Sequence, residues 1–164
     1  MSFQSYIKIK GAKQGQFKGE SKKKGRETFM EFHSYKMGSN TPVDAASGRP
    51  TGHRQHKPLI ITKERGASSP MALTAHWSNE SLPEVVIEIV GRSADGVKEI
   101  VVERITLTNA VITEINRYSA ESTKASTAHD VDFVEDISFR YQKIEVEDVV
   151  ASTMAVDDWE SPNL

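Results

Sequence analysis

Residues 84–107 read EVVIEIV, GRSADG and VKEIVVERITL, and the fold class follows mainly from this stretch. Both flanks are rich in β-branched residues, which favour strands. The Ser93-Ala94-Asp95-Gly96 segment between them carries an Asp-Gly pair, which is typical of a tight turn. The stretch therefore predicts a β-hairpin formed by residues 84–90 and 97–107.

The same two-residue alternation of apolar and polar side chains continues through much of the chain. Thr28–Met37 is rich in aromatic residues, and Thr108-Asn109 marks a turn between two β-branched runs. Further strands are predicted over residues 6–10, 28–37, 59–62, 110–118 and 131–146, the last as one long or two shorter strands.

One short helix interrupts this pattern. Ser69 suits the N-cap, Pro70 suits the first helical position, and the helix is expected to end near Ser78-Asn79. A helix of that length cannot cover about seven strands, so the strands must bury their faces on one another. The predicted class is therefore mainly β, as a barrel or a sandwich.

Length and composition set the limits of this prediction. The 164 residues suffice for about one domain, and 37% hydrophobic with 27% charged residues is typical of a globular protein. We expect a single domain over residues 1–150. The acidic tail, residues 151–164, lacks periodicity and is expected to be flexible unless something captures Trp159.

Several classes of protein are excluded at this point. No apolar run approaches the roughly 20 residues of a membrane-spanning helix, and Met1–Tyr6 lacks the features of a secretory signal peptide. The chain has no cysteine, which excludes disulfides, thiolate catalysis and cysteine-based metal sites. We therefore expect synthesis in the cytoplasm and no membrane insertion.

The net charge of −2 hides an uneven distribution. Residues 1–66 carry 14 Lys and Arg against 5 Asp and Glu, whereas residues 67–164 carry 7 against 18. Copies of such a chain attract each other head to tail if the charges also separate in space; a plain solvated surface is the alternative.

Two loops exceed the usual length in a compact domain. Gly11–Gly25 contains four glycines and five lysines, and Gly38–Pro58 contains several prolines and glycines among polar residues. Loops longer than about 12–15 residues are usually functional or disordered. We expect at least one of them to be a contact arm, with surface disorder as the alternative.

The candidate metal-binding and nucleic-acid-binding residues lack the sequence context that such sites need. His53 and His56, with Asp44 or His33, are candidate metal ligands, but the pair lies in a loop and lacks the glutamate of a zinc-protease motif. Exposed loop histidines are the alternative, and a small β-barrel metalloenzyme is the rival function. The Lys22–Lys24 run could contact nucleic acid but lacks the interleaved aromatic residues that stack on bases. A basic-loop nucleic-acid binder is therefore a further alternative, and no nucleic-acid partner is expected.

The chain resembles the Hcp family, the haemolysin-coregulated protein of bacterial type VI secretion. The most specific part of the resemblance is the Ser47–Pro58 run, followed by Ile60-Ile61-Thr62-Lys63-Glu64 and Gly66-Ala67-Ser68-Ser69-Pro70. Further matches, in the family's order, are Tyr6-Ile7-Lys8-Ile9, Phe17-Lys18-Gly19-Glu20-Ser21, Leu107-Thr108-Asn109-Ala110 and Phe139-Arg140-Tyr141-Gln142-Lys143-Ile144. The resemblance therefore covers nearly the whole predicted domain.

The resemblance implies a mainly β, Hcp-like β-barrel of two packed sheets with one short flanking helix and long extended loops. It implies a structural subunit and not an enzyme: a homo-hexameric ring that stacks into the inner tube of a contractile machine. The partners would be sheath, spike and baseplate proteins, with effector proteins carried and stabilised in the lumen. The subunit would assemble in the cytoplasm and leave the cell on sheath contraction, without a signal peptide.

The resemblance also points to the contact residues. In this family the long loop after the second strand, here Gly38–Pro58, reaches toward neighbouring rings, and the loop Gly11–Gly25 lies near ring edges. Ring–ring and subunit-interface contacts are therefore expected from Lys22, Lys23, Lys24, Ser39, Asn40, Thr41, Pro42, Val43, Asp44, Arg54, Gln55 and His56. No catalytic residue, cofactor or metal is implied.

Overall fold

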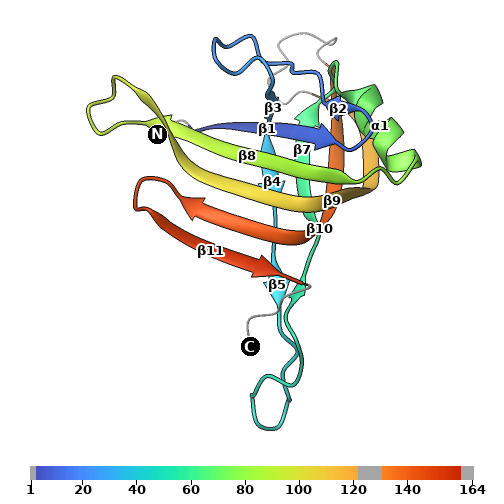
Figure 1. Ribbon diagram of the computed structural model, residues 1–164, viewed down its shortest axis with the longest axis vertical. Helices are drawn as coiled ribbons and strands as arrows, with labels where there is room; N and C mark the ends of the chain where they lie inside the picture. Colours follow the sequence, from blue (N-terminus) through green and yellow to red (C-terminus); the bar gives the residue numbers. More distant parts are fainter. Residues whose placement is uncertain (1–2, 122–130, 160–164) are drawn as a thin grey trace.

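The computed structural model describes residues 3–121 and 131–159 (Figure 1). In chain order its strands are β1 Gln4–Gly11, β2 Gly15–Gln16, β3 Met30–Phe32, β4 Ser34–Lys36, β5 Ser39–Asn40, β6 Gln55–His56, β7 Leu59–Glu64, β8 Leu82–Arg92, β9 Glu99–Glu121, β10 Val131–Asp148 and β11 Thr153–Asp158. The helix α1, Ser69–Trp77, lies between β7 and β8. The predicted mainly β class, with one short helix and long loops, is confirmed.

The hairpin predicted from residues 84–107 is present as β8 and β9. The two strands pair antiparallel from Arg92 with Glu99 to Leu82 with Ala110. Gly96 has a φ of 74°, a left-handed conformation that favours glycine, and its N–H bonds to Ser93 O over 2.8 Å. The Asp-Gly pair therefore makes the turn that was expected of it.

The turn predicted at Thr108-Asn109 is wrong, because β9 continues through it. Asn109 takes a left-handed φ of 49° inside the strand, and its side-chain amide donates to Gln142 Oε1 over 2.9 Å. The pairing of β9 with β10 stays in register on both sides of Asn109. Asparagine tolerates this conformation, so the same residue that terminates many strands is accommodated here within one.

β9 and β10 are long enough to take part in two layers (Figure 1). The first half of β9 pairs with β8, and the second half of β10 pairs with β11. The first half of β10 pairs instead with β7. The register shift at Ser138/Phe139 marks the change from one half to the other, and bulges of this kind bend strands.

The adjacent strands β3 and β4 link the two ends of the main sheet. The strand order of this sheet is β2-β1-β8-β9-β10-β7-β4, with β3 beside β1 and β11 beside β10. The predicted strand over residues 28–37 is split at His33: β3 pairs with β1, and β4 pairs with β7. The two layers therefore meet without a continuous closed ladder, because the pairing changes partner at His33.

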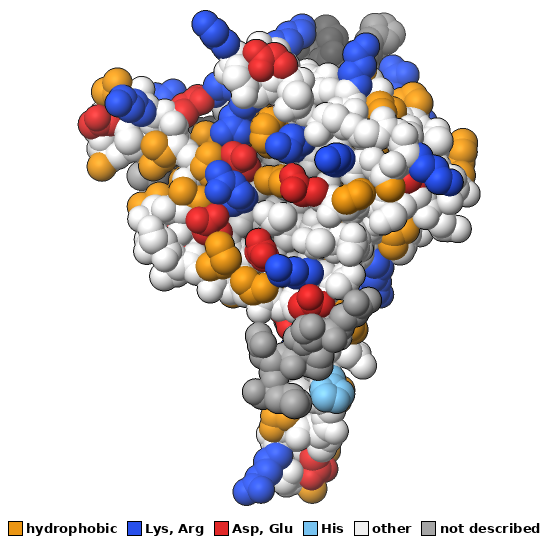
Figure 2. Space-filling model, in the orientation of Figure 1, with side chains coloured by type: hydrophobic (Ala, Val, Ile, Leu, Met, Phe, Trp, Pro, Cys, Tyr) orange, Lys and Arg blue, Asp and Glu red, His pale blue; other side chains and the backbone are white. Residues whose placement is uncertain are grey.

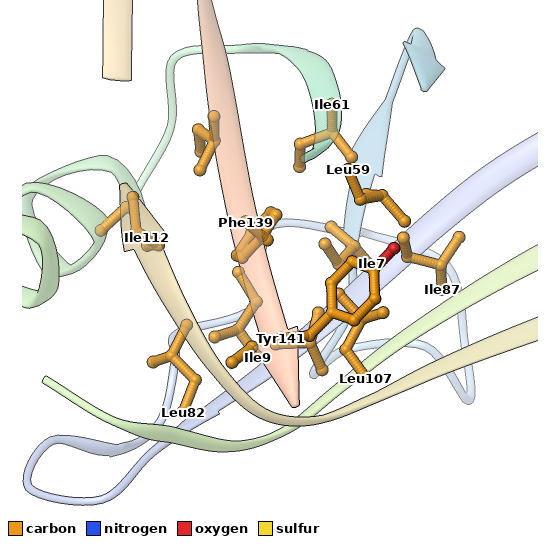
Figure 3. Packing of buried hydrophobic residues seen from close by; sticks show 14 of the residues in the cluster. Ile7, Ile9, Leu59, Ile61, Leu82, Ile87, Leu107, Ile112, Phe139 and Tyr141 are labelled. Atoms are coloured by element: carbon orange, nitrogen blue, oxygen red, sulfur yellow. The ribbon is translucent and has the colours of Figure 1, made fainter. Parts of the chain in front are cut away.

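The core lies between the two layers and is aliphatic. Figure 3 shows the side chains of β1, β7, β8, β9 and β10 meeting there. Fully buried members include Ile7, Ile9, Leu59, Ile61, Leu82, Ile87, Ile105, Leu107 and Phe139. The helix α1 adds Ala72 and Ala75 to this cluster. Burial of this apolar surface is the main stabilising term of the fold.

A buried polar cluster holds the junction between β7 and α1. Lys63 and Glu135 are each only 1% exposed, and Lys63 Nζ donates to Glu135 Oε1 over 3.3 Å. Lys63 Nζ also lies 3.1 Å from Glu20 Oε2 and donates to Glu64 O over 2.7 Å. One buried ammonium thus joins two carboxylates from segments far apart in the chain.

The same cluster corrects the predicted helix cap. The N-cap position belongs to Ser68, and Ser69 lies one residue inside the helix. Ser69 Oγ donates to Glu135 Oε1 over 2.7 Å, while Ser68 donates to Glu20 Oε1 from both N (2.8 Å) and Oγ (2.6 Å). The two serines satisfy buried carboxylates and not the helix terminus, which local sequence does not reveal.

We expect Lys63→Ala to lower the free energy of unfolding by about 3 kcal/mol, because its removal leaves the buried carboxylate of Glu135 with only the partly exposed Arg117, 3.6 Å away, as a cation. Lys36→Ala, at an exposed position of β4, is the control and should stay within about 0.5 kcal/mol of the parent. Urea unfolding at one fixed protein concentration measures both variants. A loss from Lys63→Ala no larger than that of the control would contradict this role.

Candidate functional site

The loop Gly38–Pro58 forms a two-stranded arm that extends away from the sheet (Figure 1). β5 and β6 pair antiparallel, Ser39 with His56 and Asn40 with Gln55, and a further bridge joins Val43 to Pro50. Every residue from Ser39 to His53 is exposed. A long exposed arm that makes so few contacts with its own domain offers its surface to another molecule.

A turn around Asp44 shapes the tip of the arm. Its carboxylate accepts from Ser47 Oγ over 2.8 Å and from the N–H groups of Ala46 and Ser47 over 3.2 Å. The Ser47 hydroxyl and these N–H groups lower the pKa of Asp44. Asp44 therefore organises the turn, and the Val43 side chain beside it is 60% exposed.

The base of the arm is fastened to the last strand by Asp157. Arg54 Nε donates to Asp157 Oδ2 over 2.6 Å, its Nη2 forms a second bond to Oδ1, and His56 Nε2 lies 2.5 Å from Oδ2. The Arg54 guanidinium, and after it the His56 ring, hold the pKa of Asp157 at about 2, below the ordinary 3.8. We call these three residues the arm clasp.

Aromatic and basic groups complete the surroundings of His56. Its ring lies 5.4 Å from that of Trp159 and 5.6 Å from that of Tyr141, and Arg140 Nη1 donates to its carbonyl oxygen over 2.9 Å. A hollow of about 320 Å³ is bordered by His53, the clasp residues and Trp159. The arm clasp thus combines an ion pair with the packing of aromatic rings around His56.

The C-terminal segment differs from the flexible tail expected from sequence. Thr153–Asp158 forms β11, which pairs with β10 from Asp148 with Thr153 to Lys143 with Asp158. Trp159 donates its N–H to Gln142 O over 3.0 Å. The tail is ordered by backbone pairing and by the clasp, and its last part, residues 160–164, lies outside the described residues.

The lysine-rich loop Gly11–Gly25 folds back on its own domain. Lys23 forms an ion pair with Glu99 and donates to Gln4 Oε1 over 3.2 Å, so it serves an intrachain contact. Lys22 and Lys24 are exposed, as are Lys13 and Lys18. The structure therefore brings Arg54 and His56 together, while the three predicted lysines lie on another part of the molecule.

The four histidines that the structure describes do not gather into a metal site. Within the described residues no group of three or more His, Asp or Glu side chains is placed to hold a metal ion. His53 is exposed on the arm, His56 is engaged by Asp157, and His33 lies 3.5 Å from Glu64. Asp44 is used by its own turn at the arm tip. The metalloenzyme alternative thus lacks a ligand set in this part of the chain.

Sequence reasoning missed Asp157, the residue that joins the arm to the domain. It lies 103 positions from Arg54 in the chain, and its neighbours contain no recognisable motif. The acidic segment around it, residues 151–164, was expected to be a flexible tail. The only signal in the sequence was Trp159, which was expected to matter if something captured it, and the His56 ring lies against it.

Comparisons with known proteins agree with this architecture. The family described as "Type VI secretion system effector, Hcp" matches residues 6–147. The chain belongs to the Hcp family. The "Major exported protein" of Pseudomonas aeruginosa is 33% identical over 171 residues, with 99% of this chain and 98% of that protein covered.

Solved structures support the same assignment. A crystal structure of an Hcp protein has a TM-score of 0.86 at 26% identity, covering 98% of this chain and 99% of the other. The secreted protein Hcp3 of Pseudomonas aeruginosa has a TM-score of 0.73 at 27% identity, covering 98% and 100%. Hcp proteins are secreted tube proteins of type VI secretion, a structural family and not a family of enzymes.

The face of this Hcp chain that Figure 2 shows is mixed in charge. In Figure 2, Lys and Arg side chains alternate with Asp and Glu over the sheet above the arm. One such row contains Glu88, Arg104 and Glu147, with Arg104 3.8 Å from Glu88 and 3.3 Å from Glu147. The described residues include no helix that is long and apolar enough to span a membrane.

Asp157→Asn should release the arm, because the neutral amide no longer attracts Arg54 and His56. Hydrogen exchange of the arm amides is expected to become about tenfold faster, which corresponds to roughly 1.4 kcal/mol, while core amides stay unchanged. Glu145→Gln, a change of the same kind on β10, is the control. Equal arm exchange in the two variants would contradict the clasp.

The stabilisation that the arm clasp gives should also be lost at acid pH, within one pH range. The folded pKa of Asp157 is about 2, lower than its ordinary 3.8, so the stabilisation is complete above about pH 4 and is lost as pH falls from 3.8 toward 2. Arm exchange, corrected for the intrinsic pH dependence, should rise in that window for the parent and not for Asp157→Asn. Loosening of the arm already near neutral pH would contradict this assignment.

Proposed function

We propose that this Hcp chain forms hexameric rings that stack into the inner tube of a type VI secretion machine. The proposal rests chiefly on the exposed arm, Gly38–Pro58, which is long, polar and fastened at its base by the arm clasp. An arm held in one direction loses less conformational entropy on binding than a free loop does. Such an arm suits repeated contacts between identical subunits.

The arm, with Val43 and Asp44 at its tip, is the proposed ring–ring contact. Ser39, Asn40, Thr41, Pro42, Val43 and Asp44 lie along its first half, and Arg54, Gln55 and His56 return along its second half. Its exposed side chains are mostly short and polar, so each contact is weak. Many weak contacts in series form a tube that assembles, is expelled and then separates, which is the mechanical behaviour the function requires.

The remaining parts of the proposal concern partners and location. The tube would carry and stabilise effector proteins in its lumen, inside a sheath and behind a spike on a baseplate. Assembly would occur in the cytoplasm, and sheath contraction would expel the tube. Membership of a secreted family and the relative named as an exported protein support secretion of the chain. A basic surface for nucleic acid is not part of the proposal.

Negative-stain microscopy of the purified protein tests this function. Ring-shaped particles with a central hole, and short stacks of them at high concentration, are expected. Val43→Asp at the arm tip should shorten the stacks without removing the rings, because it replaces an exposed apolar side chain of the proposed contact with an unpaired charge.

Val97→Asp is the matched control, since Val97 is 80% exposed at the tip of the β8–β9 hairpin, away from the arm. It should leave stack length unchanged. A parent protein that remains a monomer at high concentration would overturn the proposed function. Equal stack lengths in the two variants would overturn the role of the arm tip alone.

A further inference from the structure

The outer part of the arm receives little support from the rest of the domain. Residues 39–53 are all exposed. Among the described residues, the hydrogen bonds of this stretch stay inside the arm: Asp44 N donates to Arg49 O and Thr51 N donates to Pro42 O, each over 2.9 Å. The direction in which the arm points therefore depends on the contacts at its base.

Two pairs of side chains meet at that base. Arg54 and His56 are two positions apart on the returning side of the arm, so both side chains lie on one face of it. Asp157 and Trp159 are likewise two positions apart at the end of β11 and share a face. Arg54 Nε donates to Asp157 Oδ2 over 2.6 Å, and the rings of His56 and Trp159 lie 5.4 Å apart. The arm is thus fastened to the last strand of the sheet.

This arrangement makes the direction of the arm depend on how β11 pairs with β10. Asp157 lies opposite Ile144, in a register without a shift. Successive side chains of a strand point to opposite faces, so a slip of one residue would turn Asp157 away from the arm. The arm clasp therefore forms only when β11 is paired in this register.

The two arm residues of the clasp differ in their other contacts. His56 is also held from β10, because Arg140 Nη1 donates to its carbonyl oxygen over 2.9 Å and the Tyr141 hydroxyl lies 3.4 Å from its Nδ1. Within the described part of the chain, the side chain of Arg54 bonds to Asp157 alone. Loss of the Asp157 carboxylate should therefore free the arm from Arg54 outward and leave His56 and the sheet in place.

We propose that Asp157 is the positioning residue of the ring–ring contact: by binding Arg54 and His56, the last strand holds the arm in the direction in which it meets the next ring. The inference rests on the proposed rings and tube and adds what controls their stacking. A released arm samples many directions, so the affinity falls with the fraction of arms that point correctly. All arms of one ring engage together, so the loss multiplies across the ring.

Asp157→Asn tests this role, and Glu145→Gln on β10 is the control that also neutralises a carboxylate. Sedimentation velocity gives the protein concentration at which half of the rings are stacked, and negative-stain microscopy shows whether the rings are closed. Asp157→Asn should raise that concentration at least about tenfold with closed rings, whereas Glu145→Gln should match the parent. Equal stacking of the two folded variants would overturn the proposal.

Folding is checked in the same samples by circular dichroism and the thermal midpoint. If Asp157→Asn fails to fold, Arg54→Gln, which removes the same ion pair from the side of the arm, takes its place. A parent that forms neither rings nor stacks would overturn the proposed function and this inference with it. Stacks in the parent that persist equally in the folded clasp variant would remove only this inference.

A double-mutant cycle separates positioning from direct contact with the next ring. If Arg54 acts through Asp157, Arg54→Gln should weaken stacking equally with and without Asp157→Asn, because either change alone opens the clasp. Losses that add in the double variant would mean that each residue contacts the next ring by itself. That result would overturn the positioning role.

Cross-linking tests the position of the arm without the ion pair. The chain has no cysteine, so Arg54→Cys with Asp157→Cys supplies one pair of thiols that a short bismaleimide can join. Before cross-linking this variant should stack as weakly as Asp157→Asn. The cross-linked protein should stack at the level of the parent, because the arm is fastened again and loses less conformational entropy on binding. Stacking that stays weak in the cross-linked, folded protein would contradict the assigned role.

Discussion

The antiparallel ladder between β9 and β10 is the constraint on which the rest of the structure depends. It runs from Asp148 paired with Glu103 to Val131 paired with Glu121, and it changes register once, at Ser138/Phe139. Because both strands continue through this bend, each contributes to two layers, and the apolar faces of the two halves enclose one core. The other strands add to one half or the other.

Ion pairs and hydrogen bonds hold the first loop and the arm, which the β9–β10 ladder does not position. Lys63 of β7 joins Glu20 of the first loop to Glu135 of β10, and both carboxylates also bind serines at the start of α1. Asp157, with Arg54 and His56, joins the arm to β11 near the surface. In both places a charged group of one segment binds groups of a segment far away in the chain. These specific pairs hold the loops together with apolar contacts, such as the burial of Phe17 in the core.

These features suit a structural role better than a chemical one. The exposed arm and the open edge of β11 are different kinds of surface: the arm offers short polar side chains, whereas the edge offers backbone groups and apolar side chains. The arm is the proposed contact between copies of the chain. The Hcp family supplies the setting for it, a secreted tube protein of type VI secretion.

Local patterns in the sequence determined the elements: the hairpin with Asp95-Gly96, the long strand over residues 131–146, the helix after Ser69 and the two long loops. These depend on neighbouring residues, and the resemblance at Ser47–Pro58 added the family. Only the tertiary structure decided that Asn109 continues a strand, that Ser69 bonds Glu135 and that Asp157 holds the arm. It also decided which strands become neighbours, because backbone pairing between segments far apart in the chain leaves no local trace.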